Sequence, residues 1–337
     1  MAPNTAPNGV AIEVPFRKNL SELKHPVGYV AKRFSFDDFL FRKIDKQYAQ
    51  VIEGAEIKSV SRVDGMVEII LSKDGKDNSI RCKLLIGAEG DRSVTARSLG
   101  NYHVNQKHYS AAVRAYYKGV SGIHSQNFIE LHFLKNILPG YFWIFPLPNG
   151  ETNVGVGIPS QRVSQKKLNL KNEMMHIINE HPVFKERFKN AKMIGDVKGW
   201  GLPLGSQRRN ISGDNFLLTG DAASLIDPFT GEGIGNAMMS GMKAAQQAVR
   251  SLQANRYDKD FLKQYDEEVF RVLGDELNLS YKLQRISRHA FLLNFLFNKA
   301  VKNKTLREAI PFMFDNLDLR AKLKNPKFYL KLLFRYN

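Results

Sequence analysis

The first regular pattern of apolar residues along the chain has the spacing of a helix and starts near residue 33. Ser35 stands where a helix N-cap is expected, and Asp38 occupies the capping-box position three residues later. Phe34 and Phe39 are placed to form a hydrophobic staple at the same helix start. The apolar stripe comprises Phe36, Phe39, Leu40, Ile44 and Tyr48. We therefore predict a helix with a buried apolar face.

Alternating apolar and polar residues predict strands in two further regions. An antiparallel meander is expected at 55–60, 66–71 and 80–86, with turns at Asp64-Gly65 and Asp74-Gly75. Its last strand runs into Leu84-Leu85-Ile86-Gly87-Ala88, an apolar run typical of strands buried on both faces of a parallel sheet. A second, sheet-rich region is expected to contain strands at 111–117, 128–133, 141–145 and 152–158 and a helix near 168–178. A buried strand at 216–219 and a long helix from about 234 to 252 follow.

Length and composition indicate a folded protein with one large domain or two closely joined ones. The chain has 337 residues, of which 43% are hydrophobic. The single cysteine, Cys82, excludes an internal disulfide and fits a reducing compartment. No run reaches the roughly 18 apolar residues of a spanning helix, and the amino terminus shows no signal-peptide pattern. We therefore expect a cytoplasmic protein.

The excess of positive charge predicts an anionic partner or surface. Lys and Arg total 50 against 33 Asp and Glu, which gives a net charge of +17. From Tyr281 onward, 13 basic residues face three acidic ones, and apolar and aromatic residues are interleaved with them. This pattern is typical of helices in a membrane interface, so we expect peripheral contact on the inner face of a membrane. The alternative is a solvated helical cap on the main body. No nucleic-acid partner is expected, since no binding signature accompanies the charge.

One segment joins a buried strand, a glycine-rich loop and a helix start. The strand Phe216-Leu-Leu-Thr leads into Gly220-Asp221, which places Asp221 at a carboxyl end, where ligands bind in open α/β sheets. The loop glycines Gly231, Gly233 and Gly235 allow backbone N–H groups to approach a ligand closely. The positive end of the following helix can stabilise negative charge on that ligand. The segment therefore predicts a cofactor site.

This segment resembles the second flavin-binding motif of FAD-dependent oxidoreductases with the aromatic hydroxylase fold, most closely in the form of the geranylgeranyl reductase family. The resemblance implies that Asp221 holds ribityl hydroxyls of FAD and that the N–H groups around Gly233 and Ile234 face the N1 and C2-oxygen edge of the isoalloxazine. The cofactor-binding positions that it implies in this motif are Gly220, Asp221, Pro228, Gly231, Glu232, Gly233 and Ile234. An ordinary strand-loop-helix with a structural aspartate is the alternative, and the number of concordant positions counts against it.

Two shorter motifs agree with this resemblance. Arg33-x-x-Phe36-Asp37-x-x-Leu40 is similar to the arginine segment of the same flavoproteins, which implies that Arg33 contacts the cofactor phosphate or ribityl region. Gly87-Ala88-Glu89-Gly90-Asp91-Arg92-Ser93 is similar to the family motif Gly-Ala-Asp-Gly-x-x-Ser and implies cofactor contacts from Gly87, Glu89, Gly90 and Ser93. The sequence departs from the family in two places. Glu89 replaces the usual Asp, and Arg97 lies one position later than the arginine of the hydroxylases, which counts against a hydroxylase.

A third motif points to the substrate. Tyr141-Phe-Trp143-Ile-Phe145-Pro, followed by Gly155-Val-Gly157, resembles the Tyr-x-Trp-x-Phe-Pro and Gly-x-Gly signature of geranylgeranyl reductases. On a strand, Tyr141, Trp143 and Phe145 share one face, which could line a channel for a long apolar chain. The alternative is that these side chains form one face of a sheet packed in the protein core. Flavin halogenases carry a similar aromatic motif, although nearer their amino terminus.

The family begins with a βαβ unit bearing Gly-x-Gly-x-x-Gly, and nothing before Arg33 resembles it. We therefore expect a chain that lacks this unit and a weak site for the AMP half of FAD. The eight histidines show no metal-ligand spacing, and no nucleophile elbow or phosphate loop is found, so we assign no metal and no catalytic residue. A flavin reductase can work without an assigned catalytic residue, because the hydride comes from the cofactor.

The predicted fold is α/β with α+β elements: a truncated, Rossmann-like FAD domain with an inserted antiparallel-sheet substrate domain and a helical C-terminus. The predicted parts are 1–100 and 206–255 for the FAD domain, 101–205 for the substrate domain and 256–337 for the basic helical region. The predicted function is FAD-dependent reduction of carbon–carbon double bonds in an isoprenoid lipid, with NAD(P)H or a reduced protein carrier as electron donor. The alternatives are a flavin-dependent monooxygenase or halogenase acting on an apolar substrate, and an inactive fragment that binds no FAD alone.

Overall fold

The computed structural model describes residues 4–14, 28–303 and 307, and every element below lies in these ranges. Backbone contacts divide the chain into two compact units. Unit 1 contains the described residues of Met1–Phe39, Ala111–Trp200 and Lys282–Asn337, and unit 2 contains Leu40–Ser110 and Gly201–Tyr281. The domain boundaries expected at 100, 205 and 255 stay predictions. In this division, the described residues before 40 and after 281 group with the sheet of unit 1.

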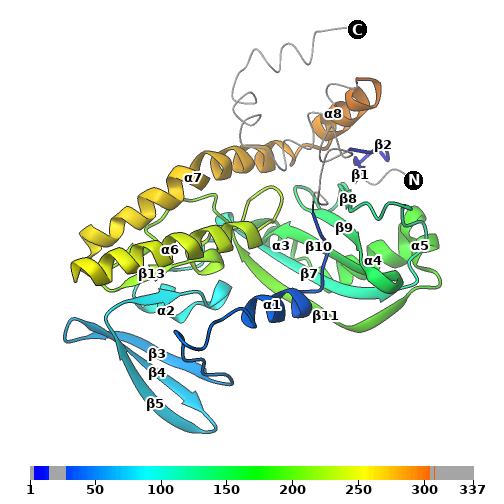
Figure 1. Ribbon diagram of the computed structural model, residues 1–337. Coiled ribbons are helices and arrows are strands. Elements are labelled where there is room, and N and C mark those ends of the chain that lie inside the picture. The colour runs from blue at the N-terminus through cyan, green and yellow to red at the C-terminus, as the bar shows by residue number, and fades with distance from the viewer. Residues whose placement is uncertain (1–3, 15–27, 304–306, 308–337) are drawn as a thin grey trace. The chain divides into compact units, whose positions relative to one another are not determined.

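Unit 1 is built on a seven-stranded sheet with the order β11-β7-β10-β9-β8-β1-β2 (Figure 1). Its strands are β1 (Asn4–Thr5), β2 (Ala11–Ile12), β7 (Tyr109–Lys118), β8 (Glu130–His132), β9 (Tyr141–Pro146), β10 (Glu151–Pro159) and β11 (Lys192–Pro203). β8, β9 and β10 pair antiparallel, as the sequence predicts, whereas β1 pairs parallel with β8. The first described residues therefore form part of this sheet.

Alternation along β9 gives the sheet two different faces. Phe142 and Ile144 are fully buried on one face beneath three helices, α3 (Ser160–Lys166), α4 (Leu170–Glu180) and α5 (Pro182–Phe188). Met174 and Phe184 of α4 and α5 pack against them, and these helices lie along the sheet in Figure 1. The predicted helix near 168–178 is thus confirmed, with Asn169 as its N-cap. The opposite face carries Tyr141, Trp143 and Phe145, which are half-buried.

A smaller apolar cluster joins the end of the described chain to the start of the sheet. Leu293 and Phe297 of helix α8 (Ala290–Lys302) are buried against Ile12 of β2 and Phe133. The other side of α8 exposes Phe291 and, further along, Lys302. The expected basic helical region is therefore helical as far as Lys302, and its remaining residues, apart from 303 and 307, lie outside the described part.

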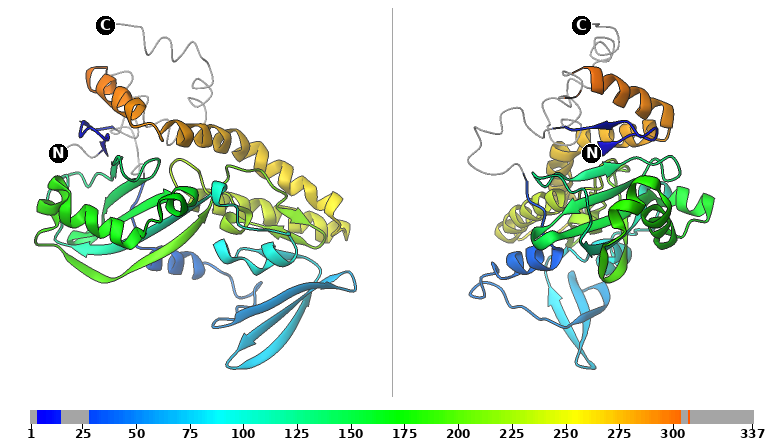
Figure 2. Two further views of the ribbon diagram at one scale, coloured as in Figure 1. Left: turned by 180° about the vertical axis from the view of Figure 1, so that it is seen from behind. Right: turned by 90° about the vertical axis from the view of Figure 1, so that its right-hand side faces the viewer.

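Unit 2 contains two three-stranded sheets and long helices. One sheet has the order β12-β13-β6, in which β13 (Phe216–Leu218) pairs parallel with β6 (Leu85–Gly87) and antiparallel with β12 (Ser212–Gly213). The other sheet is the predicted meander of β3 (Glu56–Val63), β4 (Met66–Lys73) and β5 (Lys76–Cys82), which extends from the rest of unit 2 in Figure 2. The helices are α2 (Val94–Ser98), α6 (Ile234–Ala254) and α7 (Lys259–Ile286), and short 3-10 turns lie at Gly90–Arg92 (η2) and Gly220–Ala223 (η5).

The core of unit 2 surrounds β13. Leu217 and Leu218 are fully buried and pack with Ala244 of α6 and with Leu262 and Tyr265 of α7. The Tyr265 hydroxyl donates a hydrogen bond of 2.6 Å to the Leu218 carbonyl, so a helix far along the sequence is fixed to this strand. Burial of a phenol raises its pKa, and that of Tyr265 is raised accordingly. The mixed α/β architecture predicted from the sequence is confirmed.

Two details of the prediction are wrong. Helix α1 (Arg33–Phe41) begins at Arg33 rather than after a Ser35 cap, and it ends before Ile44 and Tyr48 of the predicted stripe. Within the described chain none of its residues is buried, and Phe39 is 56% exposed. Helical periodicity identifies the apolar face but does not supply a neighbour to cover it. Similarly, Ile86 is 39% exposed rather than buried on both faces; among the described residues, β6 is the edge strand of its sheet.

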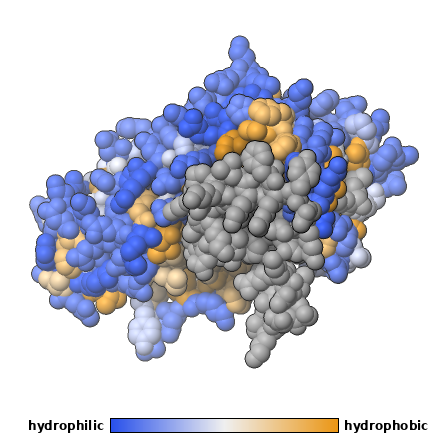
Figure 3. All heavy atoms as spheres, turned by 90° about the horizontal axis from the view of Figure 1, so that it is seen from above, coloured by the Kyte–Doolittle hydropathy of each residue, from blue (hydrophilic) through white to orange (hydrophobic). Residues whose placement is uncertain are grey.

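No helix in the described ranges is both long and apolar enough to cross a membrane. Seen from above, the side chains are mainly hydrophilic, with apolar atoms gathered in separate patches (Figure 3).

Candidate functional site

Two of the predicted cofactor motifs leave neighbouring strands of unit 2 at the same end. β6 and β13 are parallel, with Gly87 opposite Leu218, and the Thr219 N–H donates a 2.9 Å hydrogen bond to the Gly87 carbonyl. The motif from Gly87 and the motif from Gly220 therefore both start at the carboxyl edge of this sheet. This is the edge at which open α/β folds bind ligands.

The glycine loop after β13 needs glycine for its backbone conformation. Gly220 and Gly231 have φ angles of +56° and +74°, a region that L side chains rarely adopt. The Gly220 N–H donates to Ser240 Oγ on α6 at 3.0 Å, and Asn236 Nδ2 donates to the Leu225 carbonyl at 2.7 Å. These contacts fix the first part of the loop to the helix that follows it.

Asp227, which was not among the predicted site residues, holds the centre of the same loop. Its Oδ1 accepts the backbone N–H groups of Phe229 at 2.9 Å and Thr230 at 2.8 Å. Its Oδ2 accepts from Ser280 Oγ of α7 at 2.5 Å, and the side chain is buried, with the residue only 4% exposed. An Asp two residues before a backbone turn is the only local signal of this role. Its partner on α7 is 53 positions away in the sequence and could not be found from it.

The start of α6 lies beside a carboxylate. Gly233 is the N-cap of α6 and provides no side-chain cap, so the first-turn N–H groups have no such partner. A Cβ at Gly233 would lie 3.4 Å from Asp221 Oδ1 and 3.0 Å from Ile226 Cγ1, so Asp221 lies close to the helix start. Ile234 is 42% exposed. A carboxylate that can accept hydroxyl groups, next to donors at a positive helix end, fits a ribityl chain and an anionic ring edge.

The motif after β6 uses its side chains to cap α2. Glu89 accepts the Thr95 N–H at 3.0 Å and the Ser93 hydroxyl at 2.7 Å, and it also accepts the Thr95 hydroxyl. Ser93 Oγ in turn accepts the Ala96 N–H at 2.9 Å. Gly90 has a φ of +75°, which explains the glycine at that position. The cofactor contacts implied for Gly87, Glu89, Gly90 and Ser93 stay predictions, and the visible role of the two side chains is local.

A half-buried phenol adjoins this motif. The Tyr109 hydroxyl donates a short hydrogen bond to Asp91 Oδ1 of η2. Burial raises the pKa of Tyr109, and the hydrogen bond to Asp91 raises it further, so the phenol stays protonated at neutral pH. Gly201 is required next to the pair, because a Cβ there would overlap the Tyr109 hydroxyl and lie 2.4 Å from Asp91 Oδ2. Sequence reasoning did not identify this pair.

Arg33 belongs to α1 in unit 1, whereas the glycine motifs belong to unit 2. Its guanidinium makes two bonds of 3.0 and 3.1 Å to the Asp37 carboxylate, and the side chain is 59% exposed. This i,i+4 pair supports the early start of α1. Contact between Arg33 and the cofactor stays a prediction.

The predicted substrate residues share one face of the unit 1 sheet. The ring centroids of Tyr141 and Trp143 are 6.0 Å apart, and those of Trp143 and Phe145 are 6.2 Å apart. The indole N–H donates to Asn153 Oδ1 of β10 at 3.1 Å, which turns the ring across that strand. The face is therefore a continuous aromatic surface with a fixed orientation.

Gly155 and Gly157 make room for this ring. Gly155 is paired with Trp143, and a Cβ at Gly155 would lie 2.2 Å from Trp143 Cζ2. At Gly157 the nearest atoms to a Cβ, which include Trp143 Cζ3, are 3.7 Å away. The two glycines were predicted as substrate-binding residues. The structure explains the glycine at position 155 by packing alone, since the Trp143 indole occupies the space of a side chain there.

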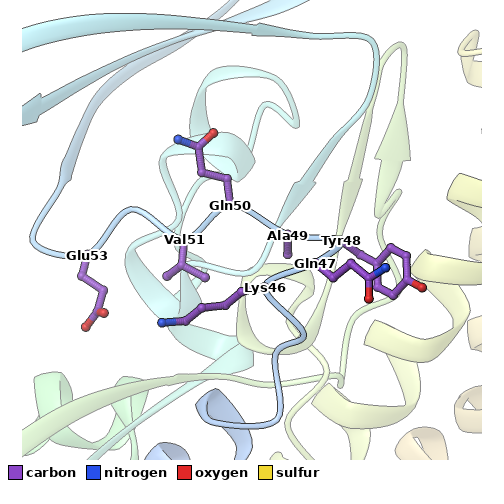
Figure 4. A pocket seen from close by; sticks show the side chains of 7 residues that line it. All are labelled: Lys46, Gln47, Tyr48, Ala49, Gln50, Val51 and Glu53. Carbon is purple, nitrogen blue, oxygen red and sulfur yellow. The ribbon is translucent and has the colours of Figure 1, made fainter.

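A hollow in unit 2 contains none of the predicted residues. It is lined by the single segment between α1 and β3, namely Lys46, Gln47, Tyr48, Ala49, Gln50, Val51 and Glu53. In Figure 4 these side chains point away from one another rather than toward a common centre. Within the described ranges, no group of three His, Cys, Asp or Glu side chains could hold a metal ion. The cofactor loop and the aromatic surface therefore remain the candidate functional features.

Comparison with known proteins agrees with these features. The profile of the FAD binding domain family matches residues 8–275. Digeranylgeranylglycerophospholipid reductase of Methanococcus aeolicus is 31% identical over 84% of this chain and 69% of its own length. The enzyme of the same name from Methanoculleus marisnigri is 30% identical over 97% of this chain and 79% of its own length.

Solved structures show the same fold. A geranylgeranyl bacteriochlorophyll reductase-like protein of Thermoplasma acidophilum superposes with a TM-score of 0.75 at 23% identity, covering 88% of this chain and 73% of that protein. A flavin-dependent brominase superposes with a TM-score of 0.63 at 22% identity, covering 84% of this chain and 71% of that protein. The reductase-like protein is therefore the more similar of these two folds.

Proposed function

The chain belongs to the family of FAD-dependent geranylgeranyl reductases, and we propose that it uses FAD to reduce carbon–carbon double bonds in the isoprenoid chains of a glycerophospholipid. The observation that carries the proposal is the arrangement at the carboxyl edge of β6 and β13. There, Asp221 lies beside the first turn of α6, whose N-cap is a glycine. The relatives named above are reductases of digeranylgeranylglycerophospholipid, which supplies the substrate class.

The residues of unit 2 would bind and polarise the cofactor. Asp221 would accept hydrogen bonds from the ribityl hydroxyls, and the N–H groups of Gly233 and Ile234 would face the isoalloxazine edge. The positive end of α6 would stabilise the negative charge of the reduced ring. When bound, FAD supplies the hydride for the double bond. Asp227 would hold the loop that carries these groups in its conformation.

The residues of unit 1 would bind the apolar substrate. Tyr141, Trp143 and Phe145 offer an aromatic surface of fixed orientation, against which a prenyl chain can exclude water. We propose NAD(P)H or a reduced protein carrier as the source of electrons. The first test below uses a chemical reductant, so its outcome does not depend on which donor is correct.

The proposal is tested first by binding. Titration with FAD should produce the visible spectrum of a bound flavin, and Asp221→Asn should weaken binding about 10-fold or more, since hydrogen bonds to a carboxylate contribute about 1.5–3 kcal/mol. Asp74→Asn, in an exposed turn of unit 2 with a φ of +52°, is the matched control and should bind like the wild type. Absence of FAD binding by this chain would contradict the proposal.

Turnover is tested with FAD reduced by dithionite and with digeranylgeranylglycerophospholipid as the substrate. Mass spectrometry should show the gain of two hydrogen atoms for each double bond reduced. An unchanged lipid in the presence of bound, reduced FAD would contradict the reductase assignment. Oxygen consumption that follows the lipid concentration would instead indicate a monooxygenase.

We also propose peripheral contact with an anionic membrane surface, where the lipid substrate resides. The support is the described part of the basic region, in which Phe291 and Phe295 are 67% and 45% exposed close to Lys299. The double variant Phe291→Gln/Phe295→Gln should sediment less with vesicles that contain anionic lipid. Equal sedimentation of the variant and the wild type would refute this role of α8.

A further inference from the structure

Two cations lie against one aromatic ring on the face of unit 1 that carries Trp143. The Arg114 guanidinium carbon is 4.4 Å from the centroid of the Tyr116 ring, and the Lys32 ammonium is 5.5 Å from the same centroid. Arg114 and Tyr116 are two residues apart on β7 and therefore share one face of the sheet. All three side chains belong to unit 1. The stacking fixes the direction of the guanidinium before any ligand arrives.

Strand register places these cations next to the aromatic surface. β7 and β10 are neighbours, the Gly119 N–H donates to the Gly150 carbonyl at 3.3 Å, and the Ala112 Cβ is 3.7 Å from the position of a Cβ on Gly157. An antiparallel alignment through these points sets Arg114 opposite Gly155, which is paired with Trp143 on the next strand. Arg114 and Trp143 thus lie in one cross-strand row, with only a glycine between them.

The charges at this edge of the face are incompletely balanced. Lys32 forms an ion pair with the Glu151 carboxylate. Arg114 is half-buried, and no carboxylate in the described part of the chain pairs with it. The group of Arg114, Lys32 and Glu151 therefore has a net charge of one positive unit, carried by a guanidinium with unused donors. Such a fork matches two oxygens of one phosphate.

We propose that Arg114, supported by Tyr116 and Lys32, binds the phosphate of the lipid substrate while the prenyl chains lie on the aromatic surface around Trp143. The inference rests on the proposed function, because it assigns the polar end of the same substrate. An amphiphile requires a polar and an apolar site close together, and the row from Arg114 to Trp143 provides both on a rigid sheet. The residue would thereby select phospholipid over neutral prenyl lipids.

The experiment measures lipid binding without FAD and without turnover. Trp143 and Trp200 are the two tryptophans of the chain, so Trp200→Phe leaves Trp143 as the only indole. In neutral detergent micelles, the emission of Trp143 is followed during titration with digeranylgeranylglycerophospholipid and, separately, with the same prenyl lipid lacking the phosphate. Arg114→Gln should weaken binding of the phospholipid about 10-fold or more and leave binding of the neutral lipid unchanged. Lys171→Gln, on the helix that covers the opposite face of the sheet, should change neither.

The outcomes separate the phosphate site from a structural role. Equal weakening of both lipids by Arg114→Gln would show that the residue only maintains the fold and would overturn the proposal, as would equal affinity of the wild type for the two lipids. Competition by inorganic phosphate against the phospholipid, but not against the neutral lipid, is expected in the wild type and should be lost in Arg114→Gln. If the phosphate preference is found but the double bonds are never reduced, the proposed function fails while the binding site is retained.

Discussion

Substitution of the two glycines of β10 by alanine should give opposite results, although the sequence motif treats them alike. A Cβ at Gly155 would lie 2.2 Å from Trp143 Cζ2 and 2.4 Å from the Val113 carbonyl oxygen. Carbon atoms normally approach no closer than about 3.5 Å. At Gly157 the nearest atoms, Ala112 Cβ and Trp143 Cζ3, are both at 3.7 Å, which is ordinary contact.

The size of the stability loss in Gly155→Ala depends on which neighbouring atoms must move. In Gly155→Ala, displacement of the indole alone does not suffice, because the Val113 oxygen belongs to the backbone of β7. Overpacking of this kind typically lowers the free energy of unfolding by about 1–3 kcal/mol. The lower conformational entropy of the unfolded alanine variant offsets about 0.5–1 kcal/mol of this loss. We therefore expect a net loss of about 1–2 kcal/mol for Gly155→Ala. For Gly157→Ala, the same entropy effect predicts no change or a small gain.

Thermal unfolding and tryptophan emission measure both effects. A loss of 1–2 kcal/mol should lower Tm by about 2–8 °C for a unit of this size. In the Trp200→Phe background, Gly155→Ala should also shift the Trp143 emission, because the indole must leave its hydrogen bond to Asn153. If Gly155→Ala unfolds at the wild-type temperature with unchanged emission, or if Gly157→Ala is the more destabilised of the two, the assigned packing of Trp143 on β10 is wrong.

Two further predictions concern buried polar groups. Ser280→Ala removes the hydroxyl that donates to Asp227 and should weaken FAD binding and lower stability by about 1.5–3 kcal/mol. Ser251→Ala on α6, whose hydroxyl has no hydrogen-bond partner among the described residues, should be neutral in both measurements. Burial lowers the pKa of His132 below its ordinary value of 6.5, against the opposing effect of the hydrogen bond that the ring donates to the Glu130 carboxylate, so the folded state holds the ring neutral. Urea midpoints should therefore fall as the pH drops below 6.5; His132→Gln should reduce that dependence, and an identical pH profile would contradict it.

Sequence reasoning succeeded where a short segment carries its own signal. The strand, glycine loop and helix from Phe216 to Ala254 appear as predicted, because periodicity and backbone freedom are local properties. The aromatic alternation of β9 likewise determined which side chains share a face. The fold class followed from these segments together with the family resemblance.

The remaining features depend on partners that are distant in the sequence. Glu130 and Arg187 form a buried ion pair of 2.6 Å across 57 positions, and Asp227 finds its donor on α7. Nothing near either residue in the sequence reveals the partner. The prediction that α1 has a buried face fails for the converse reason. An apolar stripe predicts that a neighbour covers it, but it does not show that the described chain supplies that neighbour.

Glu89 shows why matching a motif does not by itself transfer a residue's role. The family motif has Asp at this position, and the additional methylene of Glu89 lets the carboxylate reach the donors of Ser93 and Thr95 at the start of α2. The carboxylate therefore already accepts three hydrogen bonds, all from the next eight residues of the chain. Any contact with the cofactor would have to share these acceptor atoms. Backbone groups at Gly87 and Gly90, whose conformations the strand and the positive φ determine, are the better candidates for binding at this edge of the sheet.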